Sequence, residues 1–292
     1  IGALGIRYLW PRLVGEGSGG TPSGTEMGET QVRPADGMTM VYVPAGTFAM
    51  GSADGDENER PVHEVSLSAF WIDQTEVTNG QFAGFVADTG DKTLAERHGS
   101  SDILQDGNWI DTPGANWRQP LGPDGDLNGL EDYPVVHVSW EDAQAYCVWA
   151  GGELPTEAQW EYAARGPESL SYPWSNEFDG DVVNFCDTNC PFDWANREIN
   201  DGFAFTGPAG VFPAGASSAG AVDMAGNAWE WVADWYDGDY YAQSPGSNPS
   251  GPDGGDQKVM RGGSWSHDEY GVRSAYRRSD SPDFRSSLVG FR

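Results

Sequence analysis

Hydrophobic and polar residues begin to alternate regularly at Met38. The stretch "MTMVYVPAGTFAMGS" (38–52) predicts a strand, a glycine turn and a second strand. "HEVSLSAFWID" (63–73) alternates in the same way and predicts one further strand.

Three later stretches combine an apolar helical face with a helix start signal, in which a Ser or Thr N-cap is followed three residues later by Gln or Asp. No strand–helix–strand rhythm and no internal repeat accompanies them. We therefore expect one α+β domain, rich in loops, with sparse short strands and about three short helices. The three stretches are "TNGQFAGFVADTG" (78–90, Thr78 and Gln81), "SWEDAQAYCVWAGG" (139–152, Ser139 and Asp142) and "LPTEAQWEYAARG" (154–166, Thr156 and Gln159).

Composition indicates a folded but loop-rich chain, because 40 Gly and 19 Pro accompany 13 Trp. "GEGSGGTPSGTEMGE" (15–29) is typical of a flexible linker. We assign residues 1–36 to an N-terminal arm and linker, and residues 37–292 to one domain. "IGALGIRYLWPRLV" (1–14) is too short to span a bilayer. It is either a plain strand or arm, or the outer end of a membrane helix whose preceding part is missing, which would attach the protein to a membrane.

The net charge of −29 excludes nucleic acid as a partner, since such a surface repels phosphates. It suits a soluble acidic protein, or carboxylates neutralised by calcium. Cys147 lies in an apolar helical run and is expected to be buried. Cys186 and Cys190 bracket "CDTNC", which favours a local disulfide over half of a zinc site. A disulfide would favour a cell-surface or extracytoplasmic location over the cytoplasm.

Six blocks resemble, in order, the formylglycine-generating-enzyme/sulfatase-modifying-factor family. The resemblance covers about residues 37–292 and implies a C-type-lectin-like fold that calcium stabilises. The blocks are "MVYVPAGTFAMGS", "DQTEVTNGQFAGFV", "HVSWEDAQAYCVWAGGELPTEAQWEYAARG", "DMAGNAWEWVADWY", "VMRGGSW" and "GFR".

The resemblance does not carry the family's oxidase activity with it. Oxidase members bind copper through two cysteines just after Gly-Gly-Ser, and these fall on about His267 and Val272. A soft copper(I) ion needs thiolates, so we expect no copper, no oxidase activity and no catalytic residues. The iron-dependent sulfoxide-forming branch is excluded as well, because the four histidines are scattered and form no helical pair.

Calcium is the cofactor that the resemblance implies, in a structural role. Mixed carboxylate and carbonyl oxygens suit this hard cation. The first ligand set matches Asn184, Phe185, Asp201 and Phe203, and the second matches Asp223, Gly226, Ala228 and Glu230.

The closing segment, 261–292, resembles the rewritten segment of the variable proteins of diversity-generating retroelements. Four motifs, which we call the frame, are Arg-Gly-Gly-Ser-Trp, Val-Arg-Ser-Ala, Pro-Asp and Gly-Phe-Arg. Between them lie short, mixed side chains, which we call the gap residues. All of the gap residues except Glu269 are reachable from a mutated asparagine codon. We expect fourteen of them to form an exposed ligand-binding face: Ser266, His267, Asp268, Tyr270, Gly271, Tyr276, Arg278, Ser279, Asp280, Ser281, Phe284, Ser286, Ser287 and Leu288.

The expected protein is therefore a monomer without catalytic activity. It would display a hypervariable face to a protein or other surface ligand of unknown identity. A fixed sensor or regulatory domain, linked to a kinase, is the alternative, and an active oxidase is a weaker one.

Overall fold

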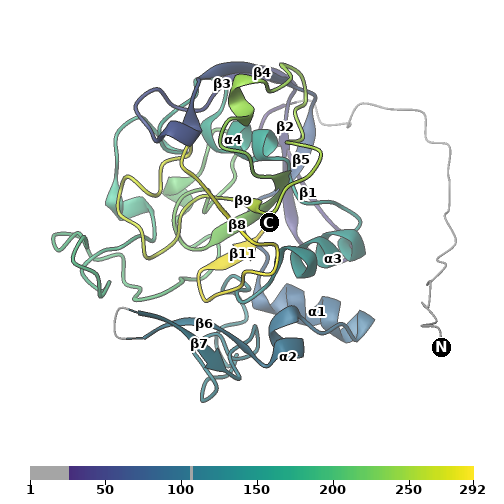
Figure 1. Ribbon diagram of the computed structural model, residues 1–292, viewed down its shortest axis with the longest axis vertical. Helices are drawn as coiled ribbons and strands as arrows, with labels where there is room; N and C mark the ends of the chain where they lie inside the picture. The colour runs from purple at the N-terminus through teal and green to yellow at the C-terminus, as the bar shows by residue number, and fades with distance from the viewer. Residues whose placement is uncertain (1–25, 106–107) are drawn as a thin grey trace, which may run out of the picture.

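The computed structural model describes residues 26–105 and 108–292. Small sheets and short helices are joined by long loops (Figure 1). This is the mixed α+β architecture that the sequence predicts. Three small sheets pair β1 (Thr30–Val32), β2 (Thr39–Val43) and β5 (Phe70–Asp73); β3 (Gly46–Met50) and β4 (His63–Leu67); and β6 (Ser100–Gln105) and β7 (Asn108–Pro113).

The central sheet has four strands in the order β10-β9-β8-β11. Strands β8 and β9 pair antiparallel with a register shift between Trp231 and Trp235, while β11 lies parallel to β8 with Val289 opposite Trp229. Three of the four strands therefore come from the C-terminal segment or lie directly before it. The strands are β8 (Trp229–Trp235), β9 (Lys258–Arg261), β10 (Arg277–Asp280) and β11 (Val289–Phe291).

The three predicted helices form, and each begins at the predicted capping box. A fourth helix, α2, was not predicted, although Thr93 and Glu96 form a box of the same kind. The α-helices are α1 (Asn79–Thr89), α2 (Leu94–His98), α3 (Trp140–Ala150) and α4 (Glu157–Arg165), and the short 3₁₀ turns are Glu57–Glu59, Gly180–Val182, Pro213–Gly215 and Tyr240–Ala242.

The single strand predicted for 63–73 is wrong, because β4 and β5 belong to different sheets. Buried side chains occupy odd positions in β4 (Val65, Leu67) and even positions in β5 (Phe70, Ile72). One continuous strand cannot bury both sets on one face. The chain bends between them, where the Ser68 amide donates to Asn248 Oδ1 at 2.8 Å.

The N-terminal arm contributes more to the fold than the sequence indicates. Strand β1 pairs with β2, and Arg33 binds Asp73 on β5 at 2.8 Å. The folded part therefore begins before residue 37. The stretch 1–14 lies outside the described residues, as does the linker up to residue 25. Among the residues that the structure describes, no helix is long and apolar enough to cross a membrane.

Aromatic side chains fill the core, and five tryptophans are fully buried: Trp117, Trp160, Trp229, Trp231 and Trp265. The C-terminal arginines reach into this core and pair with glutamates. The pairs are Arg261 with Glu161, Arg273 with Glu59, Arg277 with Glu157, and Arg292 with Glu230.

Candidate functional site

The frame of the closing segment is buried. Trp265, Ala275 and Phe291 are each at most 3% exposed, and Pro282 is half-buried. Strands β9, β10 and β11 hold this frame in the central sheet, and the arginine–glutamate pairs fix the loops between them. The segment therefore has a rigid base.

The gap residues divide into two groups. Nine are exposed or half-buried and form what we call the C-terminal face: His267, Asp268, Tyr270, Tyr276, Arg278, Ser279, Asp280, Ser281 and Phe284. The other five are buried, so the expectation that they are exposed is wrong: Ser266, Gly271, Ser286, Ser287 and Leu288.

Packing explains why these five are buried. A Cβ atom on Gly271 would lie 2.8 Å from the His267 ring, so this turn has no room for a side chain. The Ser286 carbonyl accepts from the His137 amide at 2.9 Å, and the Leu288 carbonyl accepts from the Trp229 amide at 2.7 Å. This part of the segment packs against the core rather than facing solvent.

Aromatic and charged side chains link the C-terminal face to the 3₁₀ turn Glu57–Glu59. The Tyr270 hydroxyl donates to Asp56 Oδ1 at 2.8 Å. The Arg273 guanidinium lies 4.0 Å from the centre of the Tyr270 ring and binds both oxygens of Glu59. Tyr270 is 41% exposed, so its ring is both oriented and accessible.

The sequence resemblance places one of the two cysteines of oxidase members at about His267. The His267 Nδ1 lies 3.0 Å from Ser264 Oγ, and its ring meets Trp229 edge to face. Burial lowers the pKa of His267 to about 4, so the ring is neutral at pH 7. The second position, Val272, is buried in an apolar cluster with Phe185 and Tyr172. Neither a half-buried imidazole nor an isopropyl group is the thiolate that a copper(I) ion needs.

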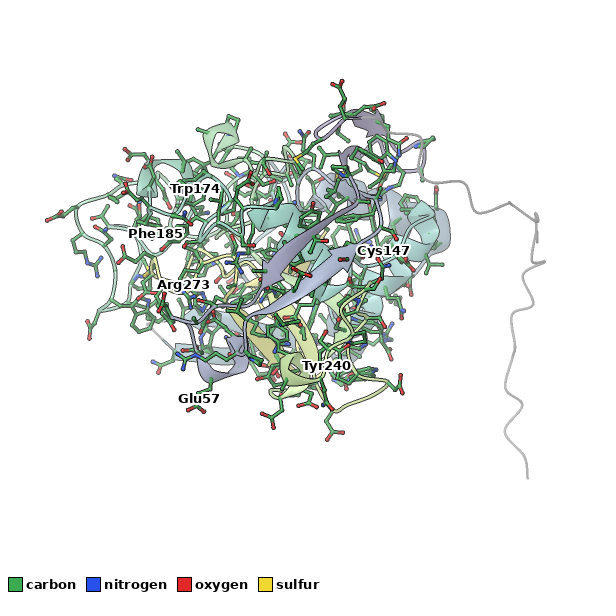
Figure 2. All side chains as sticks on the ribbon, turned by 90° about the horizontal axis from the view of Figure 1, so that it is seen from above. Glu57, Cys147, Trp174, Phe185, Tyr240 and Arg273 are labelled. Carbon is green, nitrogen blue, oxygen red and sulfur yellow. A yellow bond between two sulfur atoms is a disulfide. The ribbon has the colours of Figure 1, made fainter. Side chains whose placement is uncertain are left out.

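The cysteines of the sequence lie elsewhere. Cys186 and Cys190 form a disulfide, as expected, and Cys147 is a buried free thiol on α3. Burial raises the pKa of the Cys147 thiol well above its usual range. Figure 2 shows Cys147 toward the opposite side of the molecule from Phe185 and Arg273.

The disulfide belongs to a loop, 186–201, that supports the C-terminal face. The Cys186 amide donates to the His267 carbonyl at 2.8 Å, and Trp194 Nε1 donates to the Ser266 carbonyl at 3.0 Å. Within the loop, the Arg197 guanidinium binds the carbonyls of Thr188, Cys190 and Phe192.

The first calcium ligand set is brought together at the base of this loop. The Asp201 carboxylate accepts from the amides of Phe185 and Phe203, and Asn184 lies next to Phe185. The side-chain oxygen of Asn184 is buried and has no hydrogen-bond partner among the described residues. Burial raises the pKa of Asp201 to about 7. An orphaned oxygen beside a desolvated carboxylate fits a hard cation.

The second ligand set lies in one turn but is partly engaged. Asp223, Gly226 and Asn227 all have left-handed φ angles, so the backbone curls tightly here. The Glu230 carboxylate already accepts from both Arg292 and Trp160 Nε1. Within the described part of the chain, the Asp223 side chain accepts a hydrogen bond from the Gly210 amide, at 2.5 Å, and from no other group.

Sequence analysis missed Glu76, a buried carboxylate beside the second set. It accepts from the Asn227 side chain and the Ala228 amide. Burial, followed by the charges of Asp223 and Glu230, raises the pKa of Glu76. Three carboxylates thus lie near one guanidinium, that of Arg292, but among the described residues no group of three or more Asp, Glu, His or Cys side chains is arranged to hold a metal ion. Glu76 precedes the capping box of α1 in the sequence, but its burial has no local signal.

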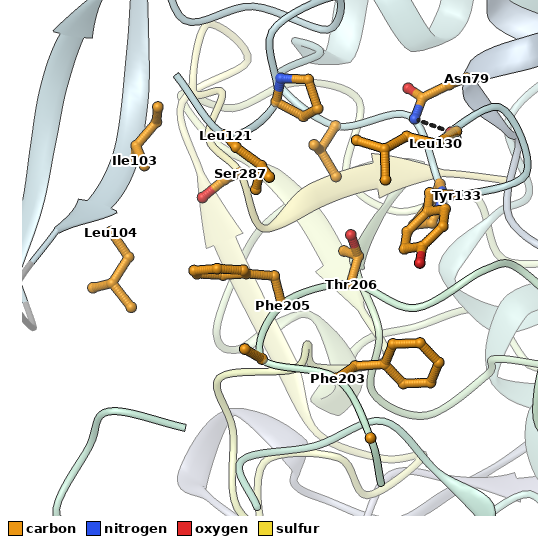
Figure 3. Close-up of a pocket in the computed structure, with 15 residues that line it drawn as sticks. Asn79, Ile103, Leu104, Leu121, Leu130, Tyr133, Phe203, Phe205, Thr206 and Ser287 are labelled. Atoms are coloured by element: carbon orange, nitrogen blue, oxygen red, sulfur yellow. Dashed lines mark hydrogen bonds between the residues drawn. The ribbon is translucent and has the colours of Figure 1, made fainter. Parts of the chain in front are cut away.

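A cavity of about 380 Å³ opens beside the C-terminal face. Figure 3 shows Thr206 between the rings of Phe205 and Tyr133, with Leu121 and Leu130 above them in the view. Ser287, one of the buried gap residues, also lines it. Sequence analysis did not anticipate this cavity, because its walls come from distant loops.

The sparse helices, small sheets and buried C-terminal frame define a protein of the C-type-lectin-like class. A profile of the "Sulfatase-modifying factor enzyme 1-like domain" matches residues 25–292. The chain therefore belongs to the formylglycine-generating-enzyme/sulfatase-modifying-factor family.

Curated relatives include both active and inactive members. The formylglycine-generating enzyme of Streptomyces coelicolor is 42% identical, over 89% of this chain and 90% of the relative. The "Inactive C-alpha-formylglycine-generating enzyme 2" of Mus musculus is 36% identical, over 90% of this chain and 87% of the relative. The serine/threonine-protein kinase Pkn1 of Chlamydia trachomatis is 33% identical over 91% of this chain, which matches 40% of that kinase.

Solved structures have the same fold. PvdO from Pseudomonas aeruginosa is similar with a TM-score of 0.71 and 26% identity, over 92% of this chain and 98% of the other. Treponema denticola variable protein 1 is similar with a TM-score of 0.64 and 22% identity, over 91% of this chain and 98% of the other.

Proposed function

We propose that this protein is a non-catalytic, ligand-binding member of its family. It binds a surface ligand through the C-terminal face, and calcium stabilises the loops beneath that face. The observation that carries the proposal is the contrast within one segment. A frame pinned by buried ion pairs carries nine exposed or half-buried side chains, and neither His267 nor Val272, on which the sequence resemblance places the oxidase cysteines, is a thiol.

The composition of the C-terminal face supports binding. Tyr270, Tyr276 and Phe284 supply aromatic contact area, and His267, Asp268, Arg278 and Asp280 supply polar specificity. Arg278 and Asp280 lie 3.7 Å apart and remain partly exposed, so both can exchange this contact for a ligand.

Calcium would be held by the first set, Asn184, Phe185, Asp201 and Phe203. When bound, the ion would offset the negative charge of the Asp201 carboxylate. It would also give the Asn184 side-chain oxygen a partner. It would act on structure, because loop 186–201 contacts the C-terminal face directly.

The proposal is tested by sequencing the 3′ end of this gene across many cells of its source population. We expect differences at the codons of the nine C-terminal-face residues, with the frame and the five buried gap codons unchanged. An invariant segment would contradict a diversified receptor. Copper binding with oxidation of peptide cysteine by the purified protein would contradict the absence of catalysis.

The likeness to Pkn1 favours a second candidate, a fixed sensor domain. That kinase contains a region similar to this chain within a longer protein. A gene that encodes a kinase domain together with this chain, and an invariant C-terminal segment, would support this candidate instead.

A further inference from the structure

We propose that the cavity beside the C-terminal face binds a small uncharged molecule with a mainly apolar body. Its volume of about 380 Å³ lies in the range of small-ligand pockets. The inference does not depend on binding through the C-terminal face, which contributes no residue to the cavity, although Phe203 of the proposed calcium set does line it.

The walls explain why the ligand is uncharged. Each of the fifteen lining residues is uncharged, in a chain whose net charge is −29. An anion would find no cation in the cavity and would be repelled by the whole protein. A cation would lose its water without gaining a carboxylate partner.

The apolar mouth of the cavity and the aromatic rings on its walls explain why the body of the ligand is apolar. Leu121 is 57% exposed and Phe205 is 41% exposed, so the mouth presents apolar surface to solvent. The rings of Phe203 and Tyr133 add flat surfaces (Figure 3). Phe205 packs edge to face on buried Trp265, which fixes its orientation. A planar or aromatic body suits these walls.

Hydroxyl groups supply orientation. Ser287 is buried, and its hydroxyl-bearing side chain lines the cavity. A ligand group that forms a hydrogen bond with this hydroxyl would be favoured over one that cannot. Thr206 and Tyr133 place further hydroxyls on the wall.

The test uses a matched pair of fluorescent probes on the full chain. N-Phenyl-1-naphthylamine is an uncharged apolar probe with one N–H donor, and 1-anilinonaphthalene-8-sulfonate adds a sulfonate to the same skeleton. We expect saturable binding of the neutral probe at one site, with a Kd of about 0.1 mM or tighter. The sulfonate should bind at least about tenfold more weakly.

Paired variants locate the binding. Leu121→Asp places a carboxylate at the mouth and should weaken the neutral probe about tenfold or more. Val148→Asp makes the same change at a 67% exposed position on α3, outside the cavity, and should leave binding unchanged. Equal effects of the two variants, equal binding of the two probes, or no saturable binding would overturn the proposal.

Discussion

At the scale of single residues, the acidic chain buries several of its few cationic side chains. The sequence has only 16 Lys and Arg against 45 Asp and Glu, yet Arg261, Arg277 and Arg292 are all at most 2% exposed. Each is paired with a buried glutamate. Removing one partner would leave an uncompensated buried charge, which costs about 3–5 kcal/mol. These arginines therefore hold the C-terminal frame more firmly than surface pairs would.

His137 is a buried neutral group at the same scale. Its ring nitrogens contact Ser101 Oγ at 2.8 Å and the Pro120 carbonyl at 3.0 Å. Burial lowers the pKa of His137 to about 4, below its ordinary value of 6.5. The unfolded chain thus binds a proton that the folded chain does not, and stability falls as the pH drops from 6.5 toward 4.

We predict that His137→Asn removes this part of the pH dependence. Asn tolerates the left-handed backbone at this position, where φ is 63°. The slope of unfolding free energy against pH, measured by urea titration between pH 6.5 and 5, should fall by about 1.4 kcal/mol per pH unit. Ser101→Ala is the control for the lost contact, because it keeps the buried imidazole and should therefore retain the slope. Parallel pH profiles for His137→Asn and the parent protein would contradict the prediction.

At the scale of elements, loop 186–201 is held in place by side-chain contacts and a disulfide rather than by regular secondary structure. It contains no helix or strand, but the disulfide, Arg197 and the Asp187–Asp201 contact close it. It then presents Trp194, which is 53% exposed, beside the C-terminal face.

We predict that the double change Cys186→Ser and Cys190→Ser lowers the free energy of unfolding by about 2 kcal/mol, the value for closing so short a loop. Hydrogen exchange at the Cys186 amide, which bonds to His267, should quicken more than exchange in β8. Equal quickening in both would place the effect in the whole fold rather than in the loop. Cys147→Ser is the control variant, because it makes the same substitution at a cysteine that forms no disulfide.

At the scale of the whole molecule, buried carboxylates lie in or beside the two proposed calcium ligand sets. A bound cation would offset their negative charge. Asp201 lies in the first calcium ligand set, and Asp223 and Glu76 lie in or beside the second. The first set joins residues 184–185 to residues 201–203, and the second, although local in sequence, lies against the distant Glu76, so an ion bound at either would hold separate segments together.

We predict that removing calcium with EGTA lowers the melting temperature by several degrees, because it leaves the Asn184 oxygen and the Asp201 carboxylate without a cation. Added calcium should restore the melting temperature, and the same concentration of magnesium should not. The Asp201→Asn variant should respond less to EGTA than the parent protein. An unchanged melting temperature in EGTA would remove calcium as a structural cofactor.

Local signals in the sequence were enough to predict the helices. The capping boxes at Thr78, Ser139 and Thr156 act within one turn, so they do not depend on the rest of the fold. The box at Thr93 and Glu96 was equally readable but was overlooked. The sequence also shows that the hydrophobic residues move from odd positions, ending at Leu67, to even positions, starting at Phe70. This shift marks the break between β4 and β5.

Long-range packing was not predictable in the same way. Ser286 and Leu288 resemble exposed gap residues by type, but their burial depends on His137 and Trp229, which lie far away in the chain. The cavity has the same origin, because Leu121, Phe205 and Ser287 meet only in the folded state.

The parallel pairing of β11 with β8 bears on how the protein is synthesised. Until Val289, Gly290 and Phe291 leave the ribosome, one edge of β8 has no partner, and that strand carries Trp229 and Trp231. An apolar strand edge of this kind recruits other chains. Nascent chains that stop before Val289 should therefore need chaperones, and the central sheet can close only after nearly all other elements have been translated.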